Sequence, residues 1–435
     1  MSGKINVPLP VNEPVLSYAP GTPEKDELKQ VLAKQSAETV EIPLLIGGEE
    51  IRTGDTGDVV MPHNHGQVIA KYHKAGPDEI SKAVDASQAA WREWSSWRWE
   101  DRAAVFLKAA ELLAGPWRQI ANASTMIGQS KTAHQAEVDA ACELIDFYRF
   151  NAYYAQQIYE DQPFSDPGMW NTSEFRALEG FVYAITPFNF TSIAGNLPGA
   201  PALMGNTVIW KPARTGMLSG YYLFKMFEEA GLPPGVFNLI TGNSAEITQR
   251  VLLDHHFAGT HFTGSTPVFN SFWKMVGDNI DNYATYPRIV GETGGKDFII
   301  AHSSADPAAL KTAIVRGSFE YQGQKCSASS RAYIPESVWA EMKDGLIEDT
   351  EGLTMGDPAD FRNFMAAVID RSAFDKIKGK LLFVVIGTDI GHVNGHAGKI
   401  AGGLLVVAVG AIARHGIYVA KELVAFFEQD GAKVF

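Results

Sequence analysis

The sequence contains very little cysteine. Only Cys142 and Cys326 occur among 435 residues, which excludes a disulfide framework and a cysteine-rich metal site and is typical of a reducing compartment. The N-terminal residues have no apolar stretch, and no Arg precedes Arg52. We therefore expect no secretory signal, no presequence and no metal. These features predict a cytoplasmic protein, with the mitochondrial matrix as the alternative if the source is eukaryotic.

The chain also lacks an excess of positive charge. Asp and Glu number 50 against 37 Lys and Arg, for a formal net charge of −13, which argues against a nucleic-acid partner. The apolar run from Ile400 to Ala413 ends at Arg414, short of the roughly 20 residues that a membrane helix needs. We therefore expect no membrane segment and interpret this run as a buried helix or a pair of strands.

Apolar and amphipathic segments alternate between residues 180 and 300. Short apolar runs predict strands, and apolar residues at helical spacing predict helices between them. The predicted strands span residues 180–186, 207–210, 236–240 and 288–290, with a further strand that ends at residues 261–262. The predicted helices span residues 218–230, 245–253 and 266–276. This rhythm favours an α/β fold with a doubly wound parallel sheet.

Outside this region the pattern is less regular. Several prolines predict an extended arm over residues 1–45. Helical spacing predicts further helices over residues 77–94, 102–113, 134–160 and 306–319. The last of these would deliver Cys326 onto a loop.

Cys326 is the most informative single residue. It lies in Gly323-Gln324-Lys325-Cys326-Ser327, which is too polar for ordinary core. A free cysteine is most often a small buried hydrophobe, but in this setting a reactive thiolate is the alternative.

Two upstream residues complete a chemical set with Cys326. Glu292 lies in Gly291-Glu292-Thr293-Gly294-Gly295-Lys296 and is either a solvated cap or a general base for water. Asn189, in Thr186-Pro187-Phe188-Asn189-Phe190, is either a turn residue or an oxyanion donor. A nucleophile, a base and an oxyanion donor are the parts needed to oxidise an aldehyde through a thioester.

Two further motifs suggest a nucleotide. Phe262-Thr263-Gly264-Ser265-Thr266 runs from a predicted strand into a predicted helix, where a helix N-terminus can hold a phosphate. Trp210-Lys211-Pro212 follows another strand, where a lysine can reach ribose or phosphate oxygens, although a solvated surface lysine is the commoner case. Neither motif is the full dinucleotide fingerprint.

Taken together and in this order, the five quoted motifs resemble the aldehyde dehydrogenase superfamily. The resemblance covers roughly residues 5–378. Shorter segments resemble the branch that oxidises L-glutamate γ-semialdehyde, namely Gln135-Ala136-Glu137, Glu143-Leu144-Ile145-Asp146-Phe147, Arg149-Phe150-Asn151-Ala152 and Gly195-Asn196-Leu197. Ser327, directly after the cysteine, also resembles that branch.

This resemblance implies a role for each site residue. Cys326 attacks the semialdehyde, Asn189 stabilises the oxyanion, and Glu292 activates the water that releases glutamate. The resemblance assigns cofactor binding to Thr186, Pro187, Lys211, Gly264 and Ser265. It assigns substrate binding to Phe190, Ser327 and Glu143, of which Phe190 could otherwise be ordinary core and Glu143 a salt-bridged helix acid. The implied cofactor is NAD, and the implied pathway is proline catabolism.

The resemblance also implies a domain organisation. Residues 1–156 and 180–290 would form the NAD-binding domain, 157–179 a bridging hairpin, and 291–378 the first half of an incomplete α/β catalytic domain. Residues 379–435 form an atypical tail. A homodimer or a higher homo-oligomer is the implied assembly.

Three alternatives remain at this stage. After residue 378 we find no Glu-Ile-Phe-Gly-Pro segment, whose Glu binds the nicotinamide ribose in the superfamily, and only Glu422 and Glu428 could replace it. A nucleotide-binding chain with little turnover is therefore the alternative to an enzyme. Arg214 stands where the family often has an acid, so NADP is the alternative cofactor. Transfer to coenzyme A is disfavoured by Glu292, because thiol attack needs no water-activating base.

Overall fold

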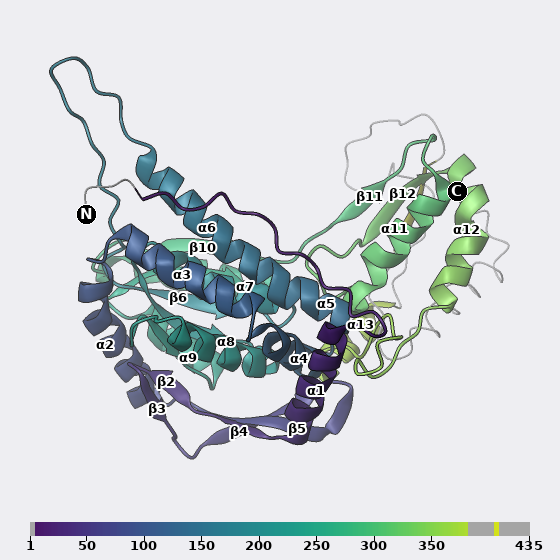
Figure 1. Cartoon of the computed structure of the whole chain (residues 1–435), viewed down its shortest axis with the longest axis horizontal. Coiled ribbons are helices and arrows are strands. Elements are labelled where there is room, and N and C mark those ends of the chain that lie inside the picture. Colours follow the sequence, from purple (N-terminus) through teal and green to yellow (C-terminus); the bar gives the residue numbers. More distant parts are fainter. Residues whose placement is uncertain (1–4, 382–403, 409–435) are drawn as a thin grey trace. The chain divides into compact units, whose positions relative to one another are not determined.

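The structure, a computed structural model, describes residues 5–381 and 404–408. These residues divide into two units (Figure 1). The first comprises the residues up to Gln129 together with Ala133–Thr293, and the second comprises Ser130–Thr132 together with the residues from Gly294 onward.

The first unit is built on a seven-stranded sheet. In spatial order its strands are β10 (Arg288–Glu292), β9 (Phe257–Thr263), β6 (Phe181–Thr186), β7 (Thr207–Pro212), β8 (Phe237–Leu239), β2 (Leu44–Ile46) and β3 (Glu49–Ile51). The first five of these are parallel, and β2 and β3 are antiparallel to their neighbours. The chain winds outward from β6 to β8 and then from β9 to β10 on the other side. The predicted doubly wound α/β fold is confirmed.

Each face of this sheet has its own apolar core. Alternate residues of a strand point to opposite faces, and in β6 Phe181 and Tyr183 join one core while Val182 and Ala184 join the other. The core with Phe181 includes residues of α2 (Pro77–Trp94), α9 (Ser244–Leu252) and α10 (Thr266–Asp278). The core with Val182 includes residues of α3 (Trp99–Ala114), α4 (Arg118–Gln129), α6 (Glu143–Glu160), α7 (Thr191–Leu203) and α8 (Met217–Glu229).

A smaller sheet accompanies the first. Its strands are β1 (Val40–Ile42), β5 (Asn64–His73) and β4 (Thr56–Met61), in that order. The long pairing of β4 with β5 makes a hairpin, and β1 runs parallel to β5.

The prediction of an extended arm over residues 1–45 is wrong in part. Residues Pro23–Ala37 form helix α1. Proline at the start of the helix and acids in its first turn favour initiation, and Leu28 and Leu32, one turn apart, are buried. The arm prediction weighted the prolines and missed this apolar pair.

The prediction of one regular helix over residues 134–160 also needs correction. A short helix α5 (Ala133–Ala136) leads into a π-helical turn, Glu137–Cys142, before α6 begins. The amide of Glu143 donates to the carbonyl of Val138, five residues back. One extra residue per turn rotates the side chains that follow, and such turns occur frequently at functional sites.

The expected hairpin over residues 157–179 starts inside α6, which ends at Glu160. Figure 1 shows the residues beyond α6 projecting as a two-armed loop. No strand is assigned between residues 161 and 179, and the arms are joined by side-chain hydrogen bonds such as Gln162 with Ser173 (2.8 Å). Its bridging role remains a prediction.

The second unit contains a three-stranded sheet with helices. Strand β12 (Arg331–Pro335) runs parallel to β11 (Phe298–Ile300) and antiparallel to β13 (Leu404–Ala408). Its helices are α11 (Pro307–Phe319), α12 (Glu336–Glu351) and α13 (Arg371–Leu381). The run at 400–413 thus includes one strand, and the rest of it lies outside the described residues.

Candidate active site

The strand order of the first unit points to one edge of the sheet. Strands β6 and β9 are adjacent, yet the chain leaves them in opposite directions. In open α/β sheets, ligands bind at the carboxyl ends of the strands at such a switch point. Thr186 ends β6, Thr263 ends β9, Lys211 lies at the end of β7, and Glu292 ends β10. Because the four strands are parallel, these residues lie along the same edge.

The segment after β6 is held to β7. The indole N–H of Trp210 donates to the Thr186 hydroxyl (3.1 Å), and the amide of Ala213 donates to the Thr186 carbonyl (3.1 Å). Pro187, Asn189 and Phe190 follow, and Phe190 is the N-cap of α7 with 8% of its surface exposed. The predicted oxyanion donor is therefore on a short, fixed connection from strand to helix.

Lys211 is the buried cation of this edge. Its residual exposure is 8%, and burial lowers the pKa of its ammonium to about 8. Across residues 5–381 and 404–408, no acid forms an ion pair with it. An unpaired buried charge is unfavourable unless a ligand compensates it, so this lysine fits an anionic or polyhydroxylated ligand.

Gly264, Ser265 and Glu292 come together at the ends of β9 and β10. The Gly264 amide donates to the Glu292 carbonyl (3.1 Å), and the Thr263 hydroxyl lies 3.5 Å from a Glu292 carboxylate oxygen. Ser265 is the N-cap of α10, and its side chain makes no capping hydrogen bond. This leaves the hydroxyl available at the N-terminus of a 13-residue helix. The Glu292 side chain is exposed.

Glu143 begins α6, directly after the π-helical turn. Its carboxylate accepts a hydrogen bond from the Ser192 hydroxyl in the first turn of α7 (2.5 Å). Further along the same two helices, the Asn151 amide donates to Asn196 (2.8 Å). Glu143 is thus linked to the helix that follows Asn189 and Phe190.

Cys326 and Ser327 belong to the second unit, in a loop between α11 and β12. Cys326 is half-buried and Ser327 is exposed. The ammonium of Lys325 pairs with Glu320 (3.2 Å). A Cβ atom at Gly295 would lie 2.4 Å from the Cys326 carbonyl oxygen, so this close approach requires glycine at position 295. The other predicted site residues all lie in the first unit.

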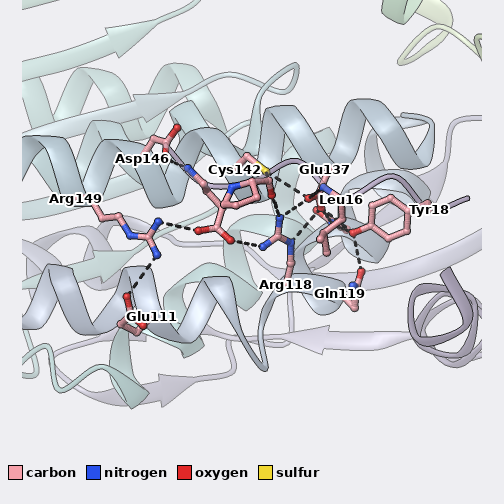
Figure 2. A network of polar contacts seen from close by, with 12 residues as sticks. Leu16, Tyr18, Glu111, Arg118, Gln119, Glu137, Cys142, Asp146 and Arg149 are labelled. Atoms are coloured by element: carbon pink, nitrogen blue, oxygen red, sulfur yellow. Dashed lines mark hydrogen bonds and ion pairs between the residues drawn. The ribbon is translucent and has the colours of Figure 1, made fainter. Parts of the chain in front are cut away.

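Sequence reasoning missed a buried polar network (Figure 2). Glu137, fully buried, forms an ion pair with Arg118. It also accepts hydrogen bonds from the Leu16 amide (2.8 Å), the Tyr18 hydroxyl (2.7 Å) and Asn122 (2.9 Å). The network joins the N-terminal arm to α4 and the π-helical turn. In the sequence, Glu137 stands out only as part of a segment of family resemblance, and nothing near it indicates its partners on α4 and in the N-terminal arm.

The second cysteine lies in this network. The Cys142 thiol contacts the Arg118 guanidinium and the Glu137 carboxylate. Burial, and then the Glu137 charge, raise the pKa of this thiol to about 12. Cys142 is therefore a poor nucleophile at neutral pH.

The described residues contain no group of three or more His, Cys, Asp or Glu side chains that could hold a metal. Within the same part of the chain, every helix is too short or too polar to cross a membrane.

The doubly wound sheet, the buried lysine at its carboxyl edge and the separate unit with a loop cysteine define an aldehyde dehydrogenase. The sequence model of the Aldehyde dehydrogenase family matches residues 51–382. The chain belongs to this family, as the motifs predicted.

Named relatives narrow the similarity further. The chain is 48% identical over 376 residues to a Δ1-pyrroline-5-carboxylate dehydrogenase of Agaricus bisporus, covering 86% of this chain and 69% of the relative. It is 48% identical over 378 residues to the mitochondrial enzyme of that name from Dictyostelium discoideum, covering 86% of this chain and 68% of the relative. The resemblance to this branch is confirmed.

A solved structure agrees with the fold. The Δ1-pyrroline-5-carboxylate dehydrogenase of Mycobacterium tuberculosis, bound with NAD, is 52% identical and superposes with a TM-score of 0.86. The match covers 88% of this chain and 72% of that one.

Proposed function

We propose that this chain oxidises L-glutamate γ-semialdehyde, the opened form of Δ1-pyrroline-5-carboxylate, to glutamate with NAD in proline catabolism. The observation that carries the proposal is the alignment of Thr186, Lys211, Ser265 and Glu292 along one carboxyl edge of a doubly wound sheet. Identity of 48% to enzymes named for this reaction supports the choice of substrate.

The residues of the first unit fit a dinucleotide. The buried Lys211 has no acidic partner in the described chain and would bond ribose hydroxyls. The N-terminus of α10, with Ser265 at its cap, would hold the pyrophosphate. Gly264, Thr186 and Pro187 would contact the cofactor from the neighbouring strand ends. NAD, when bound, accepts the hydride.

The chain's own residues would perform the remaining steps. The Cys326 thiolate attacks the aldehyde carbon, and the charge that develops on oxygen is stabilised by the Asn189 amide and the Cys326 backbone N–H. Loss of hydride from the same carbon leaves a thioester on Cys326. Glu292 then takes a proton from water, the resulting hydroxide attacks the thioester carbonyl, and glutamate leaves as the thiolate is regenerated.

Three residues would select the substrate. The ring of Phe190 would pack on the aliphatic chain, and Ser327 would bond the carboxylate. Glu143, held by Ser192, would line the pocket where the substrate's amino group enters. The mechanism requires Cys326 and Ser327 of the second unit to reach the residues of the first.

The test is NADH absorbance after mixing purified chain with NAD and the semialdehyde. Steady turnover supports the proposal. One stoichiometric burst would mean that acylation occurs but thioester release does not. No signal from a folded protein would overturn the proposal and favour a nucleotide-binding chain with little turnover. That alternative rests on the absence of a Glu-Ile-Phe-Gly-Pro segment after residue 378. Glu422 and Glu428, the only residues that could replace its Glu, lie outside the described residues.

The same assay with NADP tests Arg214. This residue begins a short 3₁₀ turn just after β7, where an acid would repel a 2′-phosphate. We expect NAD to be preferred. A higher kcat/KM with NADP would show that Arg214 recruits the phosphate and that the cofactor assignment is wrong.

Replacing Lys211 by Met is expected to stabilise the protein while weakening NAD binding. The folded pKa is about 8 against an ordinary 10.5, so wild type carries a burial cost of about 3 kcal/mol below pH 8. Between pH 8 and 10.5 the unfolded chain binds more protons, and wild-type stability rises with pH. Denaturant unfolding of both proteins at pH 7 and pH 10.5 measures this. Equal free energies of unfolding for wild type and Lys211→Met at pH 7 would contradict this expectation. So would a difference between them that does not become smaller by pH 10.5.

A further inference from the structure

The backbone ahead of Cys326 is strained. Tyr321 (φ 50°, ψ 41°) and Gln322 (φ 54°, ψ 29°) are both left-handed, and Gly323 follows at φ 65°. Glycine adopts this conformation readily, whereas Tyr and Gln rarely do. Such strain persists only where the surrounding structure enforces it, and it is concentrated at functional sites.

A third residue with positive φ, Ser130 (φ 59°), lies beside Gln322. Among the described residues, Tyr18, Ser130, Tyr321 and Gln322 are the non-glycine residues with positive φ. The Ser130 carbonyl lies 3.5 Å from the Gln322 side-chain nitrogen. Two segments far apart in sequence are therefore strained where they touch, in the same unit.

Buried side chains hold the turn in place. The fully buried Gln322 donates its amide to the Ala367 carbonyl (2.5 Å), and the Ala367 amide donates to the Ser130 hydroxyl (3.2 Å). The ammonium of Lys131 lies 4.4 Å from the centroid of the Tyr321 ring, and both side chains are fully buried. A desolvated cation over an aromatic face is a favourable contact.

The turn leaves little freedom to the residues that follow. The Gln324 amide donates to the Tyr321 carbonyl (3.0 Å), and the Gln324 side chain accepts from the Ile369 amide (2.9 Å). Cys326 comes two residues later, with its carbonyl against Gly295. The sulfur must approach the carbonyl carbon of the substrate along one direction, and a small displacement of the sulfur would slow this attack greatly. A fixed backbone ahead of Cys326 therefore favours the reaction.

We propose that Gln322 and the Lys131–Tyr321 pair are positioning residues for the Cys326 thiol. They keep residues 321–323 left-handed and so fix the place of the sulfur. The proposal rests on the proposed function, in which Cys326 is the nucleophile. Neither Gln322 nor Tyr321 needs to touch substrate or cofactor in this role.

The experiment measures the rate at which iodoacetamide alkylates the Cys326 thiol. Cys142 is buried and its pKa is raised to about 12, so at pH 6–9 the reagent modifies Cys326 selectively. Mass spectrometry identifies the labelled peptide. In Gln322→Gly, which tolerates the backbone but lacks the amide, we expect the alkylation rate to change at least threefold.

Catalysis gives the second readout. We expect kcat of Gln322→Gly to fall at least tenfold while KM for NAD stays within twofold. Tyr321→Leu, which removes the ring under Lys131, should behave like Gln322→Gly. Tyr321→Leu therefore tests the proposal even if Gln322→Gly does not fold.

The outcomes separate this proposal from the proposed function. Alkylation does not require turnover, so a changed profile in Gln322→Gly and Tyr321→Leu supports positioning even in a chain that makes no NADH. A wild-type alkylation rate in folded Tyr321→Leu and Gln322→Gly would overturn it.

Discussion

Replacing Glu292 by Gln is expected to turn continuous NADH production into one burst of a single NADH per chain. Gln keeps the size and the backbone of Glu292, whose carbonyl accepts from Gly264 (3.1 Å). It cannot take a proton from water, so the thioester on Cys326 would form and then persist. General-base loss of this kind lowers steady turnover by about 10²–10⁴-fold. Stopped-flow absorbance separates the burst from the steady rate.

Two variants serve as controls for this expectation. Cys326→Ala should give neither burst nor turnover, because no thioester can form. Cys142→Ala should leave both unchanged, since that thiol is buried in the network of Figure 2. Mass spectrometry of Glu292→Gln after mixing should find the acyl group on Cys326. Wild-type steady turnover in Glu292→Gln would show that another group activates the water.

The central sheet could be predicted from sequence because its strands are continuous apolar runs. In β6 and β7 nearly every residue is buried on both faces of a parallel sheet, and such runs are conspicuous between amphipathic helices. Helix α2 was predicted at its observed bounds, Pro77–Trp94, because its apolar residues recur at helical spacing. Local pattern and tertiary burial agree in these segments.

Helix α7 could not be predicted in the same way. It contains Pro198 and Pro201, and its glycines disfavour a helix by intrinsic propensity. Its stability comes from packing. A Cβ at Gly195 would lie 2.7 Å from a Leu144 side-chain carbon, so glycine lets α7 approach α6 closely. Such a contact depends on residues some 50 positions away and leaves no local signal.

The candidate site likewise has features that the sequence predicts and features that it does not. Its linear motifs lie at strand ends, where sequence order alone suggests a shared edge. The left-handed turn at Tyr321–Gln322 and the ion pair of Arg118 with Glu137 are set by partners distant in the chain. Both depend on tertiary contacts, so no local sequence pattern indicates them.

Replacing Arg118 by Met is expected to lower the free energy of unfolding by about 3–5 kcal/mol. Arg118 pairs with Glu137 and, at 2.5 Å, with Glu13, and both acids are largely or fully buried. Removing one partner of a buried ion pair leaves an uncompensated charge, which costs this much in other proteins. Denaturant unfolding at pH 7 measures the loss. Arg362→Met, at an exposed pair with Asp360, is the matched control and should show no measurable change.

The pH dependence identifies the source of this loss. Burial alone would raise the pKa of Glu137, but hydrogen bonds from Arg118, the Leu16 amide and Tyr18 outweigh it and hold this pKa below 4.5. A depressed carboxyl pKa contributes stability above 4.5 that is lost as pH falls. The deficit of Arg118→Met should therefore narrow below pH 4.5, where Glu137 becomes protonated. The double variant Arg118→Met/Glu137→Leu should recover part of the stability at pH 7, because it buries no lone charge at this position. A deficit below about 1 kcal/mol, or one that does not change with pH, would show that the network contributes little to the fold.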